Sequence, residues 1–394
     1  MKRSLLFLGI LSLSAGVQVS AADLSWGDPT LDSGQFKVSG AVRSRYLHKD
    51  YVVGANEGSQ NDDWRLTDIK LVLGYENPDW IAGADARCYQ YNRLCDAIFL
   101  KKAWAGYKLS DQQRITVGLQ PVDFGFGEFW GSSYYETLLN TVGLEDIDNL
   151  GIKYKFADDK YNLTLGFYPT DGGNYKGTSK NSSRYSGNFV EADDLSNGTN
   201  IEEKNMWIGR ASRKFEIDKT QNFSTELGGS AWYSDLENKR TNIDGHRKSW
   251  NIFAQTQYQA WQWMFLAGKQ DVANGDDLFP NSSTIGAFDY PYQVANKGKY
   301  LVNEINYTFA QPFHQLTNIK PYISHSRFFK DEEGYKDSER LIAGVYFNYK
   351  AIGIQGEYIM SKNDPMVGGG ANGLAQGSSN DWDKLFYLSI GYYF

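Results

Sequence analysis

The sequence has 394 residues and a formal net charge of −7, and aromatic residues make up 15% of it. A chain of this length usually forms two soluble domains. Its negative mean hydropathy excludes a helical membrane protein, and its acidic balance gives no support to nucleic-acid binding. The 27 Tyr, 11 Trp and 40 Gly instead favour a sheet in which only alternate residues face an apolar environment.

The N-terminus has the pattern of a secretory signal peptide. Two bases precede an apolar run from Leu5 to Val17, and small residues follow as far as Ala22. The run is too short to span a bilayer, and small residues are typical of a cleavage site. We therefore expect residues 1–22 to be removed and residues 23–394 to form one domain. The competing interpretation is a buried N-terminal helix.

Alternation of apolar and polar residues marks sixteen candidate strands along the mature chain. In the first, the bases Lys37, Arg43 and Arg45 alternate with apolar residues, so each strand has one polar and one apolar face. The candidate strands are residues 36–46, 66–76, 80–90, 97–109, 114–120, 150–156, 161–168, 207–217, 223–233, 250–258, 261–270, 300–309, 320–328, 341–349, 352–360 and 386–394.

The connections between these strands alternate between short and long. The long ones are rich in Gly, Asn, Ser and Asp: 47–63, 124–148, 171–204, 235–247, 272–298, 329–339 and 361–382. Short turns at one end and long loops at the other are typical of a transmembrane β-barrel, and a soluble sandwich or propeller seldom shows them. The sequence thus predicts an all-β fold, a sixteen-stranded antiparallel transmembrane barrel whose third extracellular loop folds inward.

The two cysteines, Cys88 and Cys95, lie close together in the sequence. Because the periplasm is oxidising, we interpret them as a disulfide that closes a short loop, with free thiols as the alternative. Two cysteines alone make a poor metal site. We expect neither a metal nor a cofactor.

The loop at about residues 123–148 combines aromatic residues, glycines and acids, and it contains no Lys or Arg. A barrel of this width leaves an aqueous channel unless something narrows it, and we expect this loop to do so. Its acids are Asp123, Glu128, Glu136, Glu145, Asp146 and Asp148. The bases in phase with the lumen are Lys37, Arg43, Arg45, Lys70, Arg87, Arg114, Lys153, Lys155 and Arg210. An acidic loop facing a basic wall predicts a transverse field across the constriction, which tunes ion selectivity. For any single base, simple solvation or pairing with a neighbouring acid is the alternative.

The last strand carries an unbroken apolar face made of Phe386, Leu388, Ile390, Tyr392 and Phe394. This stretch resembles the C-terminal strand signature of Gram-negative outer-membrane β-barrels. The resemblance implies that the terminal Phe belongs to a signal read by the barrel-assembly machinery in that membrane.

Two further stretches, residues 117–121 and 148–154, flank the acidic loop and resemble the sixteen-stranded trimeric porins. Residues 118–125 also look like the phosphate-selective porins, although those carry bases on the constriction loop and this chain has none there. The resemblance implies a homotrimer in the outer membrane of a Gram-negative bacterium that passes ions and small hydrophilic solutes passively. Its partners would be membrane lipid and lipopolysaccharide. Acid pairs at residues 62–63, 193–194 and 276–277 could share divalent cations with lipopolysaccharide phosphates.

The rival functions are catalysis and solute-specific transport. The chain has four His, and none has an evident nucleophile or acid at fixed spacing, so we do not expect an enzyme. A channel specific for sugars, or for small anions such as phosphate, is the stronger alternative. Trp232, Phe253, Tyr346 and Tyr387 are in phase with the lumen and could stack on sugar rings. They could equally pack beneath folded-in loops.

Overall fold

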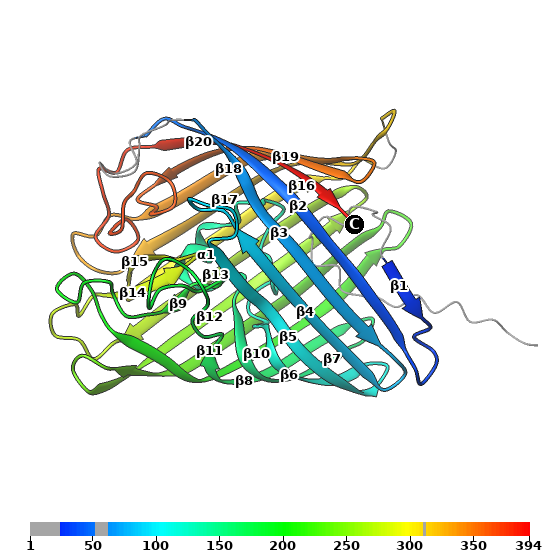
Figure 1. Cartoon of the computed structure of the whole chain (residues 1–394), viewed down its shortest axis with the longest axis horizontal. Helices are drawn as coiled ribbons and strands as arrows, with labels where there is room; N and C mark the ends of the chain where they lie inside the picture. Colours follow the sequence, from blue (N-terminus) through cyan, green and yellow to red (C-terminus); the bar gives the residue numbers. More distant parts are fainter. Residues whose placement is uncertain (1–23, 52–61, 310–312) are drawn as a thin grey trace, which may run out of the picture.

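The wall of the molecule is an antiparallel sheet that closes on itself, shown from the side in Figure 1. The computed structural model describes residues 24–51, 62–309 and 313–394. Sixteen strands form the wall: β2 (Gln35–Lys49), β3 (Asp62–Glu76), β4 (Trp80–Tyr89), β5 (Ala97–Ser110), β6 (Gln113–Pro121), β7 (Asp148–Ala157), β8 (Tyr161–Asp171), β10 (Ile201–Asp218), β11 (Phe223–Asn238), β12 (Ile243–Tyr258), β13 (Trp261–Ala273), β16 (Lys297–Tyr307), β17 (Leu316–Lys330), β18 (Ser338–Tyr349), β19 (Ile352–Lys362) and β20 (Asp383–Tyr393). The predicted sixteen-stranded antiparallel barrel is confirmed.

The barrel closes where the last strand pairs with the first strand of the wall. β20 runs antiparallel to β2, with Tyr392 opposite Val42 and Leu388 opposite Tyr46. Phe394 completes the seam, since its backbone and that of Gly40 exchange two hydrogen bonds of 2.8 and 3.1 Å. Closure leaves no free sheet edge along these strands, which is what a bilayer demands of a spanning sheet.

A short extra strand, β1 (Leu24–Gly27), continues the line of β20 along the turn end of β2. Its residue Leu24 lies opposite Val38, while the β20 residue Tyr393 lies opposite Ala41. We call the end of the barrel that carries the two-residue turns, such as residues 259–260 and 350–351, the turn end. The other end carries the long connections and is called the loop end. The described part of the chain therefore begins and ends at the turn end.

The outer surface of the wall is apolar, as the alternation predicts. Leu165 is 65% exposed and Ile252 58% exposed, although both lie in the middle of long strands. No helix in the described part of the chain is long and apolar enough to cross a membrane. The observed strands extend past the predicted ones chiefly at the loop end, where the apolar alternation fades. The predicted signal peptide, residues 1–22, lies outside the described residues.

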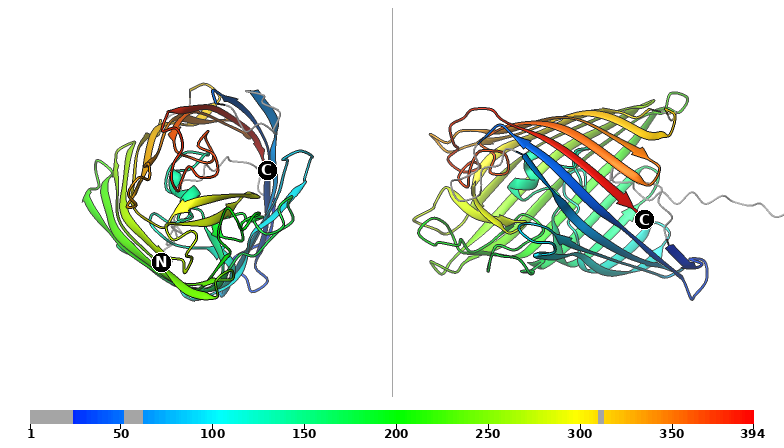
Figure 2. Two further views of the ribbon diagram at one scale, coloured as in Figure 1. Left: turned by 90° about the vertical axis from the view of Figure 1, so that its left-hand side faces the viewer. Right: turned by 45° about the horizontal axis from the view of Figure 1, so that its top comes forward.

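The loop-end half of the lumen is filled by elements that the sequence pattern did not indicate. A small sheet of β9 (Asn188–Phe189), β14 (Ser282–Ala287) and β15 (Tyr290–Ala295) and the helix α1 (Leu138–Val142) lie within the ring of strands in the view along the barrel (Figure 2). They bury a shared apolar cluster that includes Leu139, Ile285 and Leu374. Segments that looked like solvent-exposed loops are therefore packed inside the barrel, because their few apolar residues are buried there.

Candidate pore constriction

The connection between β6 and β7 crosses the lumen and binds the opposite wall. The backbone N–H of Ser132 donates to Glu304 on β16, at 2.8 Å. The N–H of Tyr134 donates to Glu357 on β19, also at 2.8 Å. The constriction loop, residues 122–147, thus uses wall carboxylates to satisfy its backbone donors, which would otherwise be buried unpaired.

Arg340 on β18 is the main anchor for the turn before α1. Its guanidinium donates to the carbonyls of Tyr135, Glu136 and Thr137 at 3.0–3.3 Å. A further hydrogen bond of 2.8 Å and an ion pair join it to Asp364, and the Arg340 side chain is 1% exposed. Thr137 also caps α1 by accepting from the N–H of Leu139. One buried arginine therefore organises the apex of the loop.

Lys101 on β5 anchors both halves of the constriction loop to the part of the wall that lies beside the loop. Its ammonium lies 2.9 Å from Glu128 and 2.7 Å from Asp146, and it is 1% exposed. The adjacent Lys102 also pairs with Glu128. Both lysines reach the lumen because a register shift lies between Asp85 and Ala86 of β4, whose partners are Lys102 and Leu100. This bulge explains why the facing of the two lysines could not be read from strict alternation.

The first turn of the loop pairs with bases on β7. Asp123 lies 2.9 Å from the Lys153 ammonium and 3.7 Å from that of Lys155. The Lys153 ammonium also donates to the carbonyl of Pro121 at 2.8 Å. Arg210 on β10 donates to the carbonyl of Gly125 at 2.8 Å. These bases therefore touch the loop directly instead of facing it across water.

Three of the remaining six predicted wall bases pair with acids of the wall, which is the alternative that the sequence left open for each base. Arg43 pairs with Asp68 on the neighbouring strand, Arg87 pairs with Asp85 on its own strand, and Lys70 pairs with the same Asp85 from the adjacent strand. Acids on the same face of the same or the adjacent strand are within reach of these side chains. Arg43 still contacts the loop, because its guanidinium lies 5.0 Å from the centre of the Tyr134 ring.

The other three bases do not contact the loop acids in the described part of the chain. Lys37 on β2 and Arg114 on β6 are exposed and lie toward the turn end. Arg45 has a buried Nε without a hydrogen-bond partner. The role of these three bases in the pore wall therefore stays a prediction.

Three of the predicted constriction acids do not line open water. Glu145, Asp146 and Asp148 are 1%, 2% and 3% exposed. Glu145 accepts from the N–H of Trp130 at 2.6 Å and from that of Thr137 at 3.1 Å, so it shapes the loop from within. Burial raises its pKa to about 7, opposed by those hydrogen bonds. These three acids are therefore buried in the packed loop and do not meet the water of the lumen.

Glu128 and Glu136 contrast with each other in their electrostatic surroundings. Burial opposes ionisation of Glu128, yet Lys101 and Lys102 hold its pKa well below the usual range. Glu136 is half-buried, and burial together with Asp146 and Glu145 raises its pKa well above the ordinary value. The loop acids therefore divide into a group neutralised by lysine and a group that favours protonation.

The aromatic residues of the loop and wall form packing contacts. Phe124 lies edge-on to Trp232 at a centroid distance of 5.7 Å, and Phe126 approaches Phe253 at 5.3 Å. Trp232 and Phe253 are 2% and 4% exposed. Tyr346 and Tyr387, the other two residues considered for sugar stacking, are 3% and 1% exposed. The four rings support packing under the folded-in loops.

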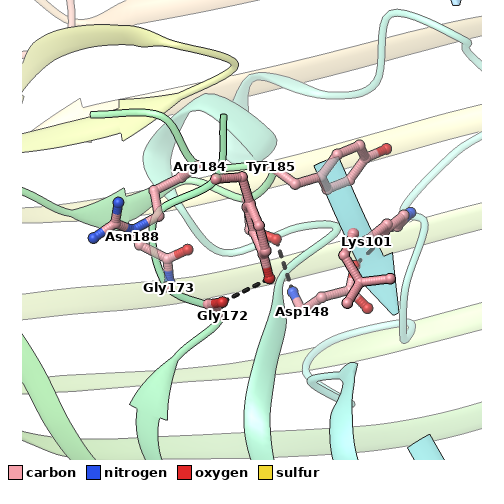
Figure 3. Close-up of a pocket in the computed structure, with 10 residues that line it drawn as sticks. Lys101, Asp148, Gly172, Gly173, Arg184, Tyr185 and Asn188 are labelled. Carbon is pink, nitrogen blue, oxygen red and sulfur yellow. Dashed lines mark hydrogen bonds and ion pairs between the residues drawn. The ribbon is translucent and has the colours of Figure 1, made fainter. Parts of the chain in front are cut away.

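A small polar cavity lies beside Lys101, where the constriction loop rejoins β7 (Figure 3). Asp148 and Lys101 line one part of it, and Arg184 and Asn188 another. Neither carboxylate oxygen of Asp148 has a hydrogen-bond partner, and Lys101 lies 3.9 Å away. The cavity suits a bound water. Among the described residues, no three His, Cys, Asp or Glu side chains are arranged to hold a metal ion.

The hairpin between β4 and β5 contains the two cysteines. Cys88 and Cys95 form a disulfide. Directly after the loop that the disulfide closes, the carboxylate of Asp96 accepts hydrogen bonds from the backbone N–H groups of Tyr91, Asn92 and Arg93 at 2.7–2.9 Å. The hairpin is thus fixed by a covalent bond and by local hydrogen bonds.

Sequence reasoning missed four groups that position the loop: Lys101, Glu304, Arg340 and Glu357. Glu304 and Glu357 lie on the polar faces of predicted strands, so alternation placed them toward the lumen, whereas Arg340 directly precedes the predicted strand 341–349. Their partners are mostly backbone groups of the loop, and a backbone group has the same chemistry at every position. The sequence therefore held a signal for where these side chains point and none for what they bind.

Comparison with known proteins agrees with this architecture. The family model described as phosphate-selective porin O and P matches residues 82–264. No match was found among curated proteins. The outer-membrane channel DcaP of Acinetobacter baumannii is similar in structure, with a TM-score of 0.61 and 10% identity, over 93% of this chain and 99% of that one.

Two other solved structures are similar over nearly their full length. For the trimer form of OmpT of Vibrio cholerae the TM-score is 0.51 and the identity 11%, over 92% of this chain and 99% of OmpT. For an anion-selective porin of Comamonas acidovorans the values are 0.52 and 11%, over 91% and 99%. The chain thus has the fold of the outer-membrane porins, and residues 82–264 match the model of one porin family.

Proposed function

We propose that this porin passes small hydrophilic solutes through a loop-narrowed lumen that favours anions. The observation that carries the proposal is the state of the loop acids. Asp123 and Glu128 are each in ion pairs with two lysines, and Glu145, Asp146 and Asp148 are buried. The loop acids therefore add little unpaired negative charge to the lumen.

The bases without a carboxylate partner support the same proposal. Among the described residues, Lys37, Arg45 and Arg114 form no ion pair, and alternation places all three on the lumen side of the wall. Glu226 on β11, an acid on the lumen side, is already paired with Arg210 at 3.2 Å. Rows of Lys and Arg attract anions in pores, so the surplus base gives the lumen its preference. The solved porin of Comamonas acidovorans is described as anion-selective.

The packed interior supports a low size limit. β9, β14, β15 and α1 occupy the loop-end half of the lumen, and the segment 363–382 binds β15 through hydrogen bonds such as that from the N–H of Ala295 to the carbonyl of Leu374, 2.9 Å. A sugar-specific track gains no support, because the four candidate aromatic rings are buried. Fold and family point to a channel and not to an enzyme.

Reversal potentials in asymmetric KCl test the proposal. We expect the wild-type channel to prefer chloride, and we expect K37Q/R114Q to shift the reversal potential toward that of a non-selective pore. The matched control K248Q/K299Q removes the same charge from outward-facing positions and should leave the potential unchanged. A cation-selective wild-type channel would refute the proposal.

We also propose a homotrimer and assembly through the C-terminal signal. The trimer form of OmpT and the shared fold support the first. The outward face of Phe386, Leu388, Ile390 and Tyr392 and the seam at Phe394 support the second. Native mass spectrometry tests the trimer, and the insertion rate after deletion of Phe394 tests the signal. Undiminished insertion would contradict a role for this residue.

Lipopolysaccharide binding through the acid pairs of the loops has weaker support. Asp63 pairs with Arg65 and Asp276 with Arg240, so these carboxylates already have basic partners. Retention of Mg²⁺ by the purified protein tests whether the acid pairs bind cations. Full release of Mg²⁺ on simple dialysis would contradict this partner.

A further inference from the structure

Two arginines stand directly opposite each other on neighbouring strands of the wall, near the loop end. Arg45 on β2 is the register partner of Arg65 on β3. The next pair in the register, Tyr46 and Trp64, lies on the outer surface, where Trp64 is 63% exposed, so both arginines point toward the lumen. Like charges directly opposite each other on two strands destabilise a sheet. Negative charge beside this pair would therefore stabilise it.

Only one of these two arginines has a carboxylate partner. The guanidinium of Arg65 lies 2.7 Å from Asp63. Arg45 forms no ion pair in the described part of the chain, and its Nε is buried without a hydrogen-bond partner. The preceding lumen-facing base on β2, Arg43, is already paired with Asp68. The charge of Arg45 is therefore the one that the neighbouring acids leave unbalanced.

Three buried hydroxyl groups on the segments around Arg45 also lack a hydrogen-bond partner. They belong to Thr67, Tyr91 and Tyr387. Thr67 is the extra residue of a β-bulge in β3, and Tyr387 on β20 is a diagonal neighbour of Arg45 in the sheet. The backbone carbonyl of Tyr91 accepts from Arg65 at 2.9 Å. A hydroxyl can donate, so these groups add to the donors that a ligand with acceptor oxygens would satisfy.

The surroundings of Arg45 are otherwise aromatic. Tyr135 of the constriction loop lies edge-on to Tyr387, with 5.8 Å between the ring centres. Burial raises the pKa of Tyr135 to about 12, and the positive charges of Arg340 and Arg45 oppose this rise, which places Arg45 near the ring. Tyr51 and Tyr135 are half-buried and pack against the apolar cluster that contains Tyr387. A ligand held by Arg45 would therefore have flat apolar surface beside its charged group.

We propose that Arg45 binds an aromatic monocarboxylate in the lumen, beside the apex of the constriction loop. A guanidinium presents two parallel N–H donors that match the two oxygens of a carboxylate. One unbalanced arginine matches one negative charge, whereas a phosphate brings more charge and more acceptor oxygens than these groups can satisfy. The ring of the ligand packs against Tyr51 and Tyr135. The inference rests on the proposed passage of anions, and it names the class of anion that the lumen binds.

Blockade of the chloride current by benzoate tests the inference. The protein is reconstituted in planar bilayers in KCl, and benzoate, acetate or inorganic phosphate is titrated while the single-channel current is recorded. We expect saturable blockade by benzoate, at lower concentrations than by acetate, which has the charge without the ring. Arg45→Gln should weaken benzoate binding by about tenfold or more, the loss expected for hydrogen bonds to a charged group.

Further variants separate binding from general effects. Arg45→Lys keeps the charge and loses the paired donors, so it should keep the ion preference and bind benzoate several-fold more weakly. Thr67→Val and Tyr91→Phe each remove a hydroxyl without a partner, so the fold should be unharmed while benzoate binding weakens. Arg213→Gln removes an outward-facing base and should bind benzoate as the wild type does.

Four results would overturn the proposal: no saturable blockade by benzoate, stronger blockade by phosphate, equal benzoate affinity in Arg45→Gln, or unchanged affinity in both hydroxyl variants. Reversal potentials of the same channels are recorded before benzoate is added. A channel that prefers chloride and that benzoate does not block would refute this site alone. A channel that prefers cations would refute the proposed function.

Discussion

The constriction loop is held in different ways by the two walls that it joins. On the near wall, β5 and β7 present lysines to the carboxylates of Asp123, Glu128 and Asp146. On the far wall, β16, β18 and β19 present Glu304, Arg340 and Glu357 to backbone groups of the loop. The contacts with the near wall depend on the side chains of the loop, whereas the contacts with the far wall depend on the course of its backbone.

This difference indicates how substitutions in the loop affect its contacts with each wall. A change of side chain in the loop alters the near contacts one at a time, whereas the far contacts persist as long as the backbone keeps its course. Leaving a buried charge without its partner costs more than losing a surface pair. The two walls can therefore be separated by variants that remove one anchor from each.

The largest effect is expected for Arg340→Met on the far wall. The change removes the donors to three carbonyls and leaves Asp364 buried without its base, a loss of about 3–5 kcal/mol. The apex of the loop should detach, so that single-channel conductance rises and becomes noisy. The control is Arg213→Met, which removes an outward-facing base that packs against the Tyr161 ring. This variant should leave both the conductance and its noise unchanged. Unchanged conductance in the Arg340 variant would show that the loop does not need this anchor.

A smaller effect is expected for Lys101→Met on the near wall. The loss leaves Glu128 paired with Lys102 but leaves the buried Asp146 without a base. We expect a lower midpoint of thermal unfolding, followed by the heat-dependent gel shift of the barrel. Lys102→Met, which loses one partly exposed pair, should cost about 1 kcal/mol or less. Equal midpoints for the two lysine variants would contradict the central place of Lys101.

The smallest effect is expected from pH and concerns Glu145. Its pKa is raised to about 7 in the packed loop, from an ordinary value of 4.5. The packed state therefore binds the proton more tightly, and its stability is full below about pH 4.5 and falls as pH rises through 7. Protease cleavage of the loop should be several-fold faster at pH 8 than at pH 5. Glu145→Gln mimics the protonated acid and should weaken this dependence, and Glu136, whose pKa is also raised, accounts for part of what remains. Faster cleavage at pH 5 than at pH 8 would contradict this prediction.

The sequence by itself determined the wall. Alternation is a local property, and a bilayer imposes one apolar face on every strand, so all sixteen strands could be predicted, and the facing of most of them. The facing of Lys101 and Lys102 could not be predicted, because a β-bulge interrupts the two-residue alternation there. The acids of the constriction loop were recognised as a group, and their proximity to bases was anticipated for Lys153 and Lys155.

Only the tertiary structure decided which charges meet water. Glu145 and Asp148 carry the same charge as Asp123 in the sequence, yet their burial depends on how the loop packs against residues far away in the chain. The inner sheet of β9, β14 and β15 was invisible for the same reason, since strands of two to six residues carry too little pattern to be found. The apolar contacts that hold these elements exist only once the barrel has closed around them.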